Sequence, residues 1–523
     1  MSELSETLFE AILHARQRVY EVGKTTPLQQ LHLRDVNAIV YAKREDLGPI
    51  KAYKWRGAYN CMINLSEEQR ARGVVAASAG NHGQGVALAA KRLNCPAHIF
   101  MPRSTPEVKQ RAVKAHGGDH AHIQLIGDSY DAASCAAKEF AHEHGMAFVH
   151  PYDDIATMGG QGTLADEVLM SGKGPFDRIY LQIGGGGLAS GCACWFRHFS
   201  KNCKIIGVEG VDQACMKLAL EHNQRDILPY VDVFCDGTAV RQAGEKTFAL
   251  CQELLDEVIT VNNDEICQAM RACWESARVI PEPSGVMGLA ALLKDWDEGR
   301  IKEGEKCLIV ISGANMDFSR LGALAQRALV RDKTRSLRYL RMPMETKRGQ
   351  VLKYLRSIPE GIQLRDVQYG RVDSDVQYPV FGVYGTEEDF EQIQERLKEH
   401  GFEYEDVTND TDVRFRMIVY DRGRLSHPVF FTIEFPERPG SFLEFMQVMG
   451  EYSNLCYFNY QYSGENVGRA LVGFEFESRE IRDACRIRAA EMIGTTIQGL
   501  HELTPEVRRR VLGQFSSMKS DKA

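Results

Sequence analysis

A lysine set between aromatic residues is the first feature of this sequence that points to chemistry. Lys54 follows the turn signal Gly48-Pro49 and begins a segment with helical spacing of apolar residues. The aromatic residues Tyr53 and Trp55 flank it. Partial burial and the positive end of a helix both disfavour an ammonium, so a lysine placed here can lose its proton near neutral pH. Its amine is then a nucleophile able to form a Schiff base. A lysine on a solvated helix face is the simpler interpretation of this stretch alone.

A second motif opens a helix after a short apolar run at residues 73–77, and it reads Ser78-Ala79-Gly80-Asn81-His82-Gly83-Gln84-Gly85. Small residues at a helix N-terminus let backbone N–H groups converge on an anion, and a substrate carboxylate suits such a site. Asn81 can add a side-chain hydrogen bond to a cofactor. An ordinary strand-to-helix turn capped by Ser78 and Asn81 explains the same residues equally well. On its own, His82 is expected to be a structural histidine with satisfied hydrogen bonds.

Four consecutive glycines form the third motif, Gly184-Gly185-Gly186-Gly187, between a predicted strand at 177–183 and a predicted helix at 188–199 that begins with Leu188. Such a turn means that the backbone approaches something closely, and a phosphate group is the expected ligand. The spacing also fits a dinucleotide fingerprint, in which Glu209 would bind a ribose. That fingerprint normally heads its domain, and it would leave Lys54 and the Ser78–Gly85 loop without a role.

The last buried strand of this region ends in Ser312-Gly-Ala-Asn315. Ligands of open α/β sheets gather at the carboxyl ends of strands. A serine hydroxyl there can hydrogen-bond a neutral ring nitrogen, whereas a carboxylate would keep that nitrogen protonated. A polar strand end followed by a glycine turn is the alternative interpretation.

Composition restricts the classes of function. The chain has 523 residues, of which 44% are apolar and 26% charged, and its net charge is −8. These values are typical of a globular protein of about three domains, and the net negative charge without a basic block argues against nucleic acid as the main partner. No apolar run reaches the ~18 residues of a membrane span, and the acidic N-terminus does not resemble a signal peptide. The 14 cysteines contain no Cys-x-x-Cys pair, which predicts reduced thiols and a cytoplasmic location.

Other common catalytic motifs are missing from the sequence. It contains no His-Glu-x-x-His or clustered cysteines, no Gly-x-Ser-x-Gly and no Walker loop, and we expect no metal site. The acid pair Glu45-Asp46 is predicted to lie on the surface or in salt bridges.

The elements that must position these motifs follow from the alternation of apolar runs and amphipathic stretches between residues 7 and 325. Candidate strands lie at 97–101, 120–126, 177–183, 204–209 and 307–312, and candidate helices at 85–93, 106–116, 130–144 and 162–170. This alternation predicts an α/β domain of parallel sheets covered by helices. A basic helical stretch at about 317–341 is interpreted as a neck.

After the neck the chain repeats itself weakly. Each repeat has a strand ending at a proline (336–343 and 429–436), a helix (350–358 and 442–451), a further strand (378–384 and 469–476) and a second helix (387–400 and 479–492). Two β-α-β-β-α units of about 80–90 residues fit this pattern. We therefore predict four parts: a domain at 1–325, a neck at 326–341, and α+β units at 342–422 and 423–523.

Taken in order, these motifs resemble those of the fold type II (tryptophan synthase β-like) pyridoxal-phosphate enzymes, and most closely the biosynthetic threonine dehydratases. Supporting segments are 19–29, Lys43-Arg-Glu-Asp46, Gly160-Gln-Gly-Thr163, Asp236-Gly-Thr-Ala-Val-Arg241 and Glu282-Pro-Ser-Gly285. The likeness covers nearly the whole chain. The two C-terminal units resemble the family's ACT-like regulatory domains, the second more closely than the first.

The resemblance implies a role for each motif. Lys54 would hold pyridoxal 5'-phosphate through its amine and remove the α-proton of threonine. Asn81 would bond the ring hydroxyl, Gly184 to Gly187 with Leu188 the phosphate, and Ser312 the pyridine nitrogen. The substrate carboxylate would lie against Ser78, Ala79, Gly80, Asn81 and His82. The products would be 2-oxobutanoate and ammonia, in the first step of isoleucine biosynthesis.

The resemblance also implies partners: an amino-acid effector (isoleucine, possibly valine) and a homo-oligomer, a tetramer by analogy. The family often has Ser-Phe-Lys followed by Leu, where this chain has Ala52-Tyr53-Lys54-Trp55, so Ala52 and Trp55 bear on substrate preference. Alternatives are another fold type II activity (serine dehydration, racemisation, diaminopropionate cleavage or β-replacement) and an inactive amino-acid sensor.

Overall fold

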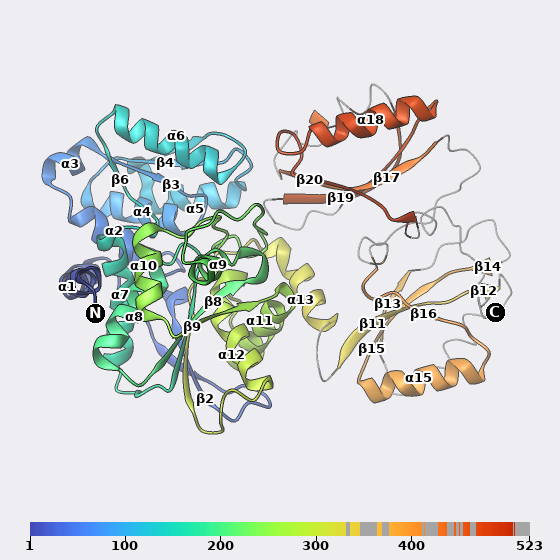
Figure 1. Ribbon diagram of the computed structural model, residues 1–523, viewed down its shortest axis with the longest axis horizontal. Coiled ribbons are helices and arrows are strands. Elements are labelled where there is room, and N and C mark those ends of the chain that lie inside the picture. The colour runs from blue at the N-terminus through green and yellow to red at the C-terminus, as the bar shows by residue number, and fades with distance from the viewer. Residues whose placement is uncertain are drawn as a thin grey trace. The chain divides into compact units, whose positions relative to one another are not determined.

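The computed structural model describes residues 1–330, 335–345, 363–368, 376–410, 413, 427–436, 444, 445, 449, 453–460, 467–505 and 507. The chain divides into two compact units, residues 1–318 and residues 319–523 (Figure 1). The finer division into a neck at 326–341 and a boundary between 422 and 423 stays a prediction. Among the described residues, no helix is long and apolar enough to cross a membrane.

A six-stranded sheet forms the larger half of the first unit. Its strand order is β1 (Leu28–Leu31), β2 (Ile39–Arg44), β10 (Lys306–Ile311), β7 (Arg178–Gln182), β8 (Lys204–Gly210) and β9 (Glu257–Val261). All neighbours pair in parallel except β1, which runs antiparallel to β2 at the edge. The last strand in the sequence, β10, therefore lies in the middle of the sheet.

A smaller parallel sheet completes the first unit. Its order is β5 (Ala121–Leu125), β4 (Ala97–Met101), β3 (Val74–Ala77) and β6 (Ala147–Phe148). Each strand predicted for residues 7 to 325 is present with ends shifted by at most one residue. The predicted parallel α/β architecture is confirmed, while β1, β6 and β9 escaped the sequence analysis because they are short or only half-buried.

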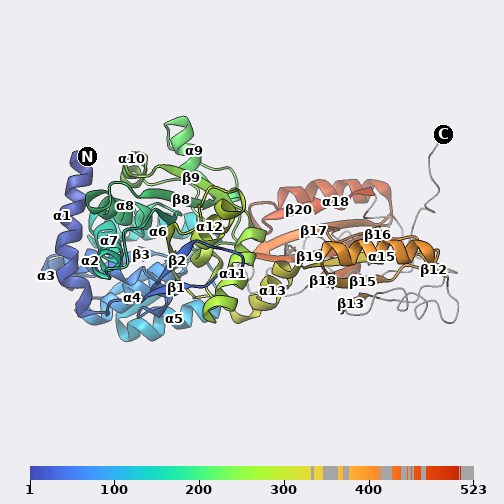
Figure 2. The ribbon, with the colours of Figure 1, turned by 90° about the horizontal axis from the view of Figure 1, so that it is seen from below.

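Helices cover both sheets. They are α1 (Glu3–Arg18), α2 (Trp55–Ile63), α3 (Glu67–Arg72), α4 (Asn81–Leu93), α5 (Glu107–Gly117), α6 (Tyr130–Glu143), α7 (Ile155–Met170), α8 (Gly187–Phe199), α9 (Cys215–His222), α10 (Glu245–Leu254), α11 (Asn263–Ala277) and α12 (Met287–Asp297). Helix α1 packs against α7 at the outer edge of this unit (Figure 2). The prediction of a helix at 162–170 was too short: α7 begins at residue 155, where the Asp154 side chain caps it.

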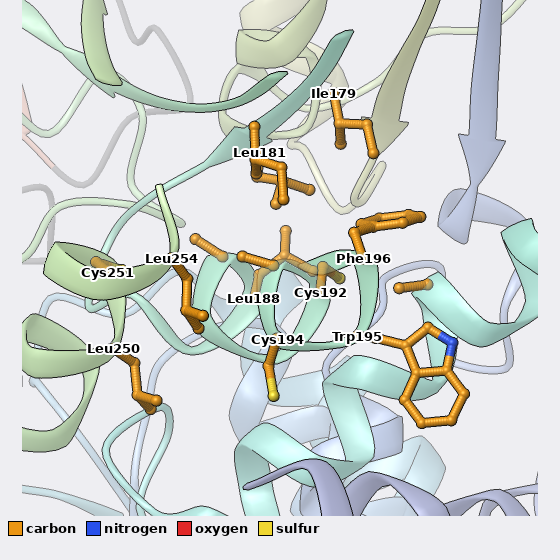
Figure 3. Close-up of a cluster of buried hydrophobic side chains, with 14 of the residues drawn as sticks. Ile179, Leu181, Leu188, Cys192, Cys194, Trp195, Phe196, Leu250, Cys251 and Leu254 are labelled. Atoms are coloured by element: carbon orange, nitrogen blue, oxygen red, sulfur yellow. The ribbon is translucent and has the colours of Figure 1, made fainter. Parts of the chain in front are cut away.

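The main core lies between strand β7 and helices α8 and α10. Figure 3 shows this cluster, in which the labelled side chains are Ile179, Leu181, Leu188, Cys192, Cys194, Trp195, Phe196, Leu250, Cys251 and Leu254. All of them are at most 2% exposed. Burial on this scale stabilises the unit by about 1.5–3 kcal/mol for each large aliphatic or aromatic side chain, and it fixes the end of β7 where the glycine motif begins.

The second unit contains two antiparallel four-stranded sheets with the same connectivity. One has the order β13 (Gln363–Gln368), β15 (Val380–Gly385), β11 (Ser336–Arg341), β16 (Glu405–Asp406), and the other β18 (Asn454–Tyr460), β19 (Val467–Glu475), β17 (Val429–Pro436), β20 (Gly499–Glu502). A two-stranded pair, β12 (Met344–Glu345) with β14 (Val376–Gln377), stands apart. In both sheets the first strand in the sequence is central, flanked by the third and fourth, which supports the predicted repeat.

Helices α13 (Leu321–Val330), α15 (Glu387–Glu399) and α18 (Arg479–Glu491) are the described α-helices of this unit. Thr386 and Asp389 form a reciprocal capping box at the start of α15, which explains why that helix begins where the sequence predicted. The predicted helix at 350–358 and most of the one at 442–451 lie outside the described residues.

Candidate active site

Lys54 stands immediately before the first residue of α2, as its spacing predicted. Its Nζ donates a hydrogen bond of 3.0 Å to the carbonyl oxygen of Pro151 and lies 5.4 Å from the ring centre of Tyr53. Burial lowers the pKa of Lys54 to about 8, and the negative charge of Glu282 partly opposes this shift. A fraction of the amine is therefore neutral at physiological pH, as a nucleophile requires.

Backbone hydrogen bonds fix the approach to Lys54 against the end of β10. The N–H of Tyr53 donates to the carbonyl oxygen of Ser312 (3.0 Å), and the N–H of Ala314 donates to that of Lys51 (2.9 Å). Two motifs that lie more than 250 residues apart in the sequence are thereby brought together.

The Ser78–Gly85 loop leads from β3 into α4. The backbone N–H groups of Ala79, Asn81 and His82 donate to no acceptor within the described part of the chain, as expected for a first helical turn. A Cβ added at Gly80 would meet no atom within 4 Å, so the loop is open on that side. Free N–H groups on an open helix N-terminus suit an anion such as a carboxylate.

His82 is buried, and its imidazole is only half satisfied. Its Nε2 lies 2.9 Å from the carbonyl oxygen of Val149, so Nε2 carries the proton and donates. Its Nδ1 has no hydrogen-bond partner among the described residues. Burial, with the nearby charge of Lys54, lowers the pKa of His82 to about 3. The ring is thus neutral at working pH, and the expectation of a fully satisfied histidine was wrong for Nδ1.

Asn81 belongs to a small network that joins three parts of the site. Its Nδ2 donates to Oε1 of Glu282 (2.7 Å), and its Oδ1 accepts from Nδ2 of Asn315 (2.8 Å). The backbone N–H of Asn315 donates to the other carboxylate oxygen of Glu282 (3.1 Å). Nδ2 carries two hydrogens, so Asn81 keeps one for a ligand.

Glu282 was not among the predicted site residues. It is buried beside Gly313, where an added Cβ would stand 2.4 Å from its Oε1. Burial, reinforced by the charge of Asp236, raises the pKa of Glu282 to about 7. In the sequence analysis Glu282 stood within the family-like segment Glu282-Pro-Ser-Gly285, but it was given no role in the site.

The four-glycine motif follows β7 and opens α8, as predicted. An added Cβ would lie 2.3 Å from the ring of Tyr152 at Gly185 and 2.7 Å from Cβ of Thr247 at Gly186, whose φ of +97° also requires glycine. The protein's own side chains crowd one face of the loop. The N–H groups of Gly184, Gly185 and Gly186 donate to no acceptor within the described ranges, and this arrangement suits a phosphate.

The dinucleotide alternative is contradicted by Glu209. This carboxylate is fully buried and accepts hydrogen bonds from the backbone N–H groups of Met216 (2.9 Å) and Lys217 (2.8 Å) in the first turn of α9. It is occupied in capping that helix, so it is not available to a ribose.

Ser312 follows β10 and is buried, and its backbone N–H donates to the carbonyl oxygen of Gly285 (3.1 Å). The structure thus brings Lys54, the Ser78–His82 loop and Ser312 together, while the glycine motif shares the edge formed by the carboxyl ends of β7 and β10.

The unusual residues beside Lys54 are fully buried. Ala52 and Trp55 are both 0% exposed. The indole of Trp55 lies between Gly23 and Gly48, at each of which an added Cβ would come within 2.8 Å of it. The bulk of Trp55 is therefore accommodated by the glycines Gly23 and Gly48.

Comparison with known proteins places this geometry in a family. Residues 19–313 match the family model of pyridoxal-phosphate dependent enzymes, and residues 424–496 match the C-terminal regulatory domain of threonine dehydratase. The biosynthetic L-threonine dehydratase of Haemophilus influenzae is 37% identical over 90% of this chain and 91% of its own length. The chain belongs to the threonine dehydratase family of pyridoxal-phosphate-dependent enzymes.

Further threonine dehydratases extend this similarity. The mitochondrial enzyme of Saccharomyces cerevisiae is 35% identical over 89% of this chain and 83% of its own length. Among solved structures, the processed threonine deaminase isoform 2 from Solanum lycopersicum matches with a TM-score of 0.59 and 40% identity, over 63% of this chain and 94% of that one. Maize serine racemase matches with a TM-score of 0.56 and 33% identity, over 61% and 95%. Membership confirms the predicted cofactor and fold class.

Proposed function

We propose that this threonine dehydratase family member converts L-threonine to 2-oxobutanoate and ammonia, as the first step of isoleucine biosynthesis. The observation that carries the proposal is a lysine amine with a pKa lowered to about 8, held against the end of β10 near a helix N-terminus with free N–H groups. The threonine dehydratases that match along 89–90% of the chain support the choice of substrate.

The residues present fit pyridoxal phosphate. Lys54 would hold its aldehyde carbon, and the free N–H groups of Gly184 to Gly187 and Leu188 would hold its phosphate. The hydroxyl of Ser312 would face the ring nitrogen, and the second Nδ2 hydrogen of Asn81 would reach the ring hydroxyl. When bound, this cofactor supplies an electron-accepting ring that stabilises negative charge on the carbon next to the substrate amine.

The chain's own groups would then act on threonine. The N–H groups in the Ser78–His82 loop would orient its carboxylate, with Ala79 and Gly80 leaving room for it. The neutral Nζ of Lys54 would take the α-proton, a general-base role that a lowered pKa favours. The C–O bond to the β-hydroxyl would break, and the hydroxyl would take up one proton and leave as water, which balances the α-proton transferred to Nζ of Lys54. The released aminocrotonate would then gain water and lose ammonia to give 2-oxobutanoate.

Substitution of Lys54 tests the proposal. We expect Lys54→Ala to remain folded, to lose the visible absorbance of the covalently bound cofactor and to lose turnover of threonine. Spectra before and after addition of L-threonine, with 2-oxobutanoate measured alongside, give the result. Unchanged absorbance and turnover in this variant would contradict the assignment of Lys54.

Serine is the second candidate substrate, because the similarity to maize serine racemase reaches 33% identity. A panel of amino acids, with the products resolved by chirality, separates the two reactions. Formation of D-serine from L-serine would favour the serine reaction. So would a rate of pyruvate formation from L-serine that exceeds the rate of 2-oxobutanoate formation from threonine.

Regulation and assembly belong to the same proposal. We infer that residues 319–523 bind an amino-acid effector, isoleucine or valine, since residues 424–496 match a threonine dehydratase regulatory domain. We also propose a cytoplasmic homo-tetramer, which light scattering of the purified chain at several concentrations would test.

A further inference from the structure

Three sequence segments that received no role above meet in one place behind Lys54. They are the stretch around Thr26, the run Lys43-Arg-Glu-Asp46 and the run Gly160-Gln-Gly-Thr163. Their meeting point is a cluster of four buried charges whose side chains are at most 4% exposed: Lys43, Glu45, Arg56 and Glu167. With two cations and two anions, the cluster is neutral as a whole.

Arg56, two residues after Lys54, is the centre of the cluster. Its guanidinium binds Glu45 with two hydrogen bonds of 2.9 Å and binds Glu167 with two of 2.6 and 3.0 Å. A fifth bond reaches the hydroxyl of Thr163 (3.1 Å). All five N–H groups of the guanidinium thus point to oxygen atoms, and the paired contacts fix its orientation as well as its position.

The remaining members complete the charge balance. Nζ of Lys43 donates to Glu167 (2.5 Å) and to the carbonyl oxygen of Thr26 (2.5 Å), and the hydroxyl of Thr26 donates to Glu45 (2.5 Å). Burial alone would raise the pKa of Glu167, but Arg56 and Lys43 lower it. The carboxylate of Glu167 is therefore ionised, and Glu45 and Glu167 are both paired with cations.

Helices α2 and α7 cross at this point with their backbones in contact. A Cβ added at Gly160 would stand 2.5 Å from the carbonyl oxygen of Arg56 and 2.6 Å from Cα of Gly57. The N–H of Gly57 donates to Oε1 of Gln161 (3.2 Å). The start of α2 is therefore held by backbone contact as well as by charge.

Buried ion pairs are poor sources of stability, because apolar side chains of similar size often serve as well. Hydrogen-bonded ion pairs are directional, whereas apolar packing is not. They therefore fix both the orientation and the position of one helix end. The helix end fixed here carries Lys54, the residue whose amine has to meet both a carbonyl carbon and an α-proton.

We propose that Arg56, with Glu45, Glu167 and Lys43, is a positioning residue that sets the location and the restricted solvent access of the Lys54 amine. The inference rests on the proposed role of Lys54 and goes beyond it by assigning the group that places that lysine. Loss of the cluster would let the start of α2 shift and admit water to Nζ.

The test compares Arg56→Met and Arg56→Lys with the unchanged full-length chain. Lys54 is labelled at a series of pH values with a trace of acetic anhydride after removal of the cofactor. The labelling is read by mass spectrometry with the exposed Lys201 as internal standard. We expect the labelling midpoint of Lys54 to rise by about one pH unit in Arg56→Met, because a hydrated ammonium is more stable. In the cofactor-loaded enzyme, kcat should fall about 100-fold with a smaller change in KM.

A matched control is Arg16→Met. Arg16 pairs with Asp166, the neighbour of Glu167 on α7, at 2.8 Å, so its ion pair is with α7 and not with α2. It should lose some thermal stability without any shift of the Lys54 midpoint. Arg56→Lys keeps the charge but reaches only one carboxylate, so it should fold and show an intermediate midpoint and kcat.

A folded Arg56→Met or Arg56→Lys chain with the original midpoint and kcat overturns the proposal. If Arg56→Met does not fold, the labelling midpoint and kcat of Arg56→Lys alone test the proposal. The labelling is carried out on cofactor-free protein, so it reports the placement of Lys54 even if Lys54→Ala shows that the assigned reaction is wrong.

Discussion

Two histidines near Lys54, the buried His82 and the partly buried His150, are held in their neutral form by the folded structure. Burial lowers the pKa of His82 to about 3 and that of His150 to about 4. Because both values lie below the ordinary pKa of about 6.5, protons bind to the unfolded chain first as the pH falls. Each histidine therefore contributes stability that is present above pH 6.5 and is lost progressively below it.

His82→Gln tests this dependence on pH. The glutamine amide can donate to Val149 as Nε2 does and does not titrate. Between pH 7 and pH 5 the original chain should lose on the order of 2 kcal/mol more unfolding free energy than the variant. Thermal unfolding of both chains at the two pH values gives the comparison, and an equal loss in both would refute the expectation.

Glu282 provides a second test at this scale. Its negative charge raises the pKa of Lys54 against the larger effect of burial. Glu282→Gln should therefore move the labelling midpoint of Lys54 in the cofactor-free chain to lower pH, opposite in direction to Arg56→Met. A midpoint that stays in place or rises would contradict this coupling.

The places of Lys54, the Ser78–His82 loop and Ser312 at the ends of strands and the starts of helices were predictable, because each follows an apolar run that marks a strand or precedes a helix. Glu282 and Arg56 were not, because a charged residue in a sequence is normally a surface residue. The pair Glu45-Asp46 illustrates what the sequence does not reveal. Salt bridges were expected for it, but nothing in the sequence indicated that Glu45 would be 0% exposed.

At the scale of elements, the crossing of α2 and α7 makes a sharp prediction. Gly160→Ala places a Cβ 2.5 Å from a backbone oxygen that cannot move aside, so we expect a loss of about 3 kcal/mol or more and lower turnover. Gly322→Ala in α13 is the control, because an added Cβ there meets nothing within 4 Å. It should leave stability unchanged or raise it by up to about 1 kcal/mol. The melting temperatures of both variants test this prediction. Similar values for the two would argue against backbone contact between α2 and α7 at Gly160.

The ends of helices and strands were predicted correctly where an element is buried along its whole length. Strands such as β4 and β10 are buried apolar runs, so their ends were predicted to within a residue. The start of α7 was missed because its three glycines interrupt helical periodicity. Those glycines are explained only by what touches them, α1 at Gly159, α2 at Gly160 and α8 at Gly162, and sequence alone does not show tertiary contacts.

At the scale of the molecule, catalysis and regulation are predicted to separate between the two units. Every proposed site residue lies in residues 1–318, which contain their own core. A chain ending after Val330 should therefore retain turnover of threonine but lose its response to isoleucine. Rates with and without isoleucine in both chains test this, and a truncated chain that still responds would place the effector in the first unit.

The middle position of β10 has a consequence for how the chain is made. Its neighbours β2 and β7 are synthesised long before it, and at about 5–20 residues per second the ribosome needs roughly a quarter of a minute to a minute to travel from residue 45 to residue 305. The edge of β2 remains unpaired throughout that time, and the edge of β7 remains unpaired once residue 182 has been made. Such edges attract other strands. The nascent chain should thus depend on chaperones during translation, and premature termination before residue 306 should yield aggregates instead of a partly active fragment.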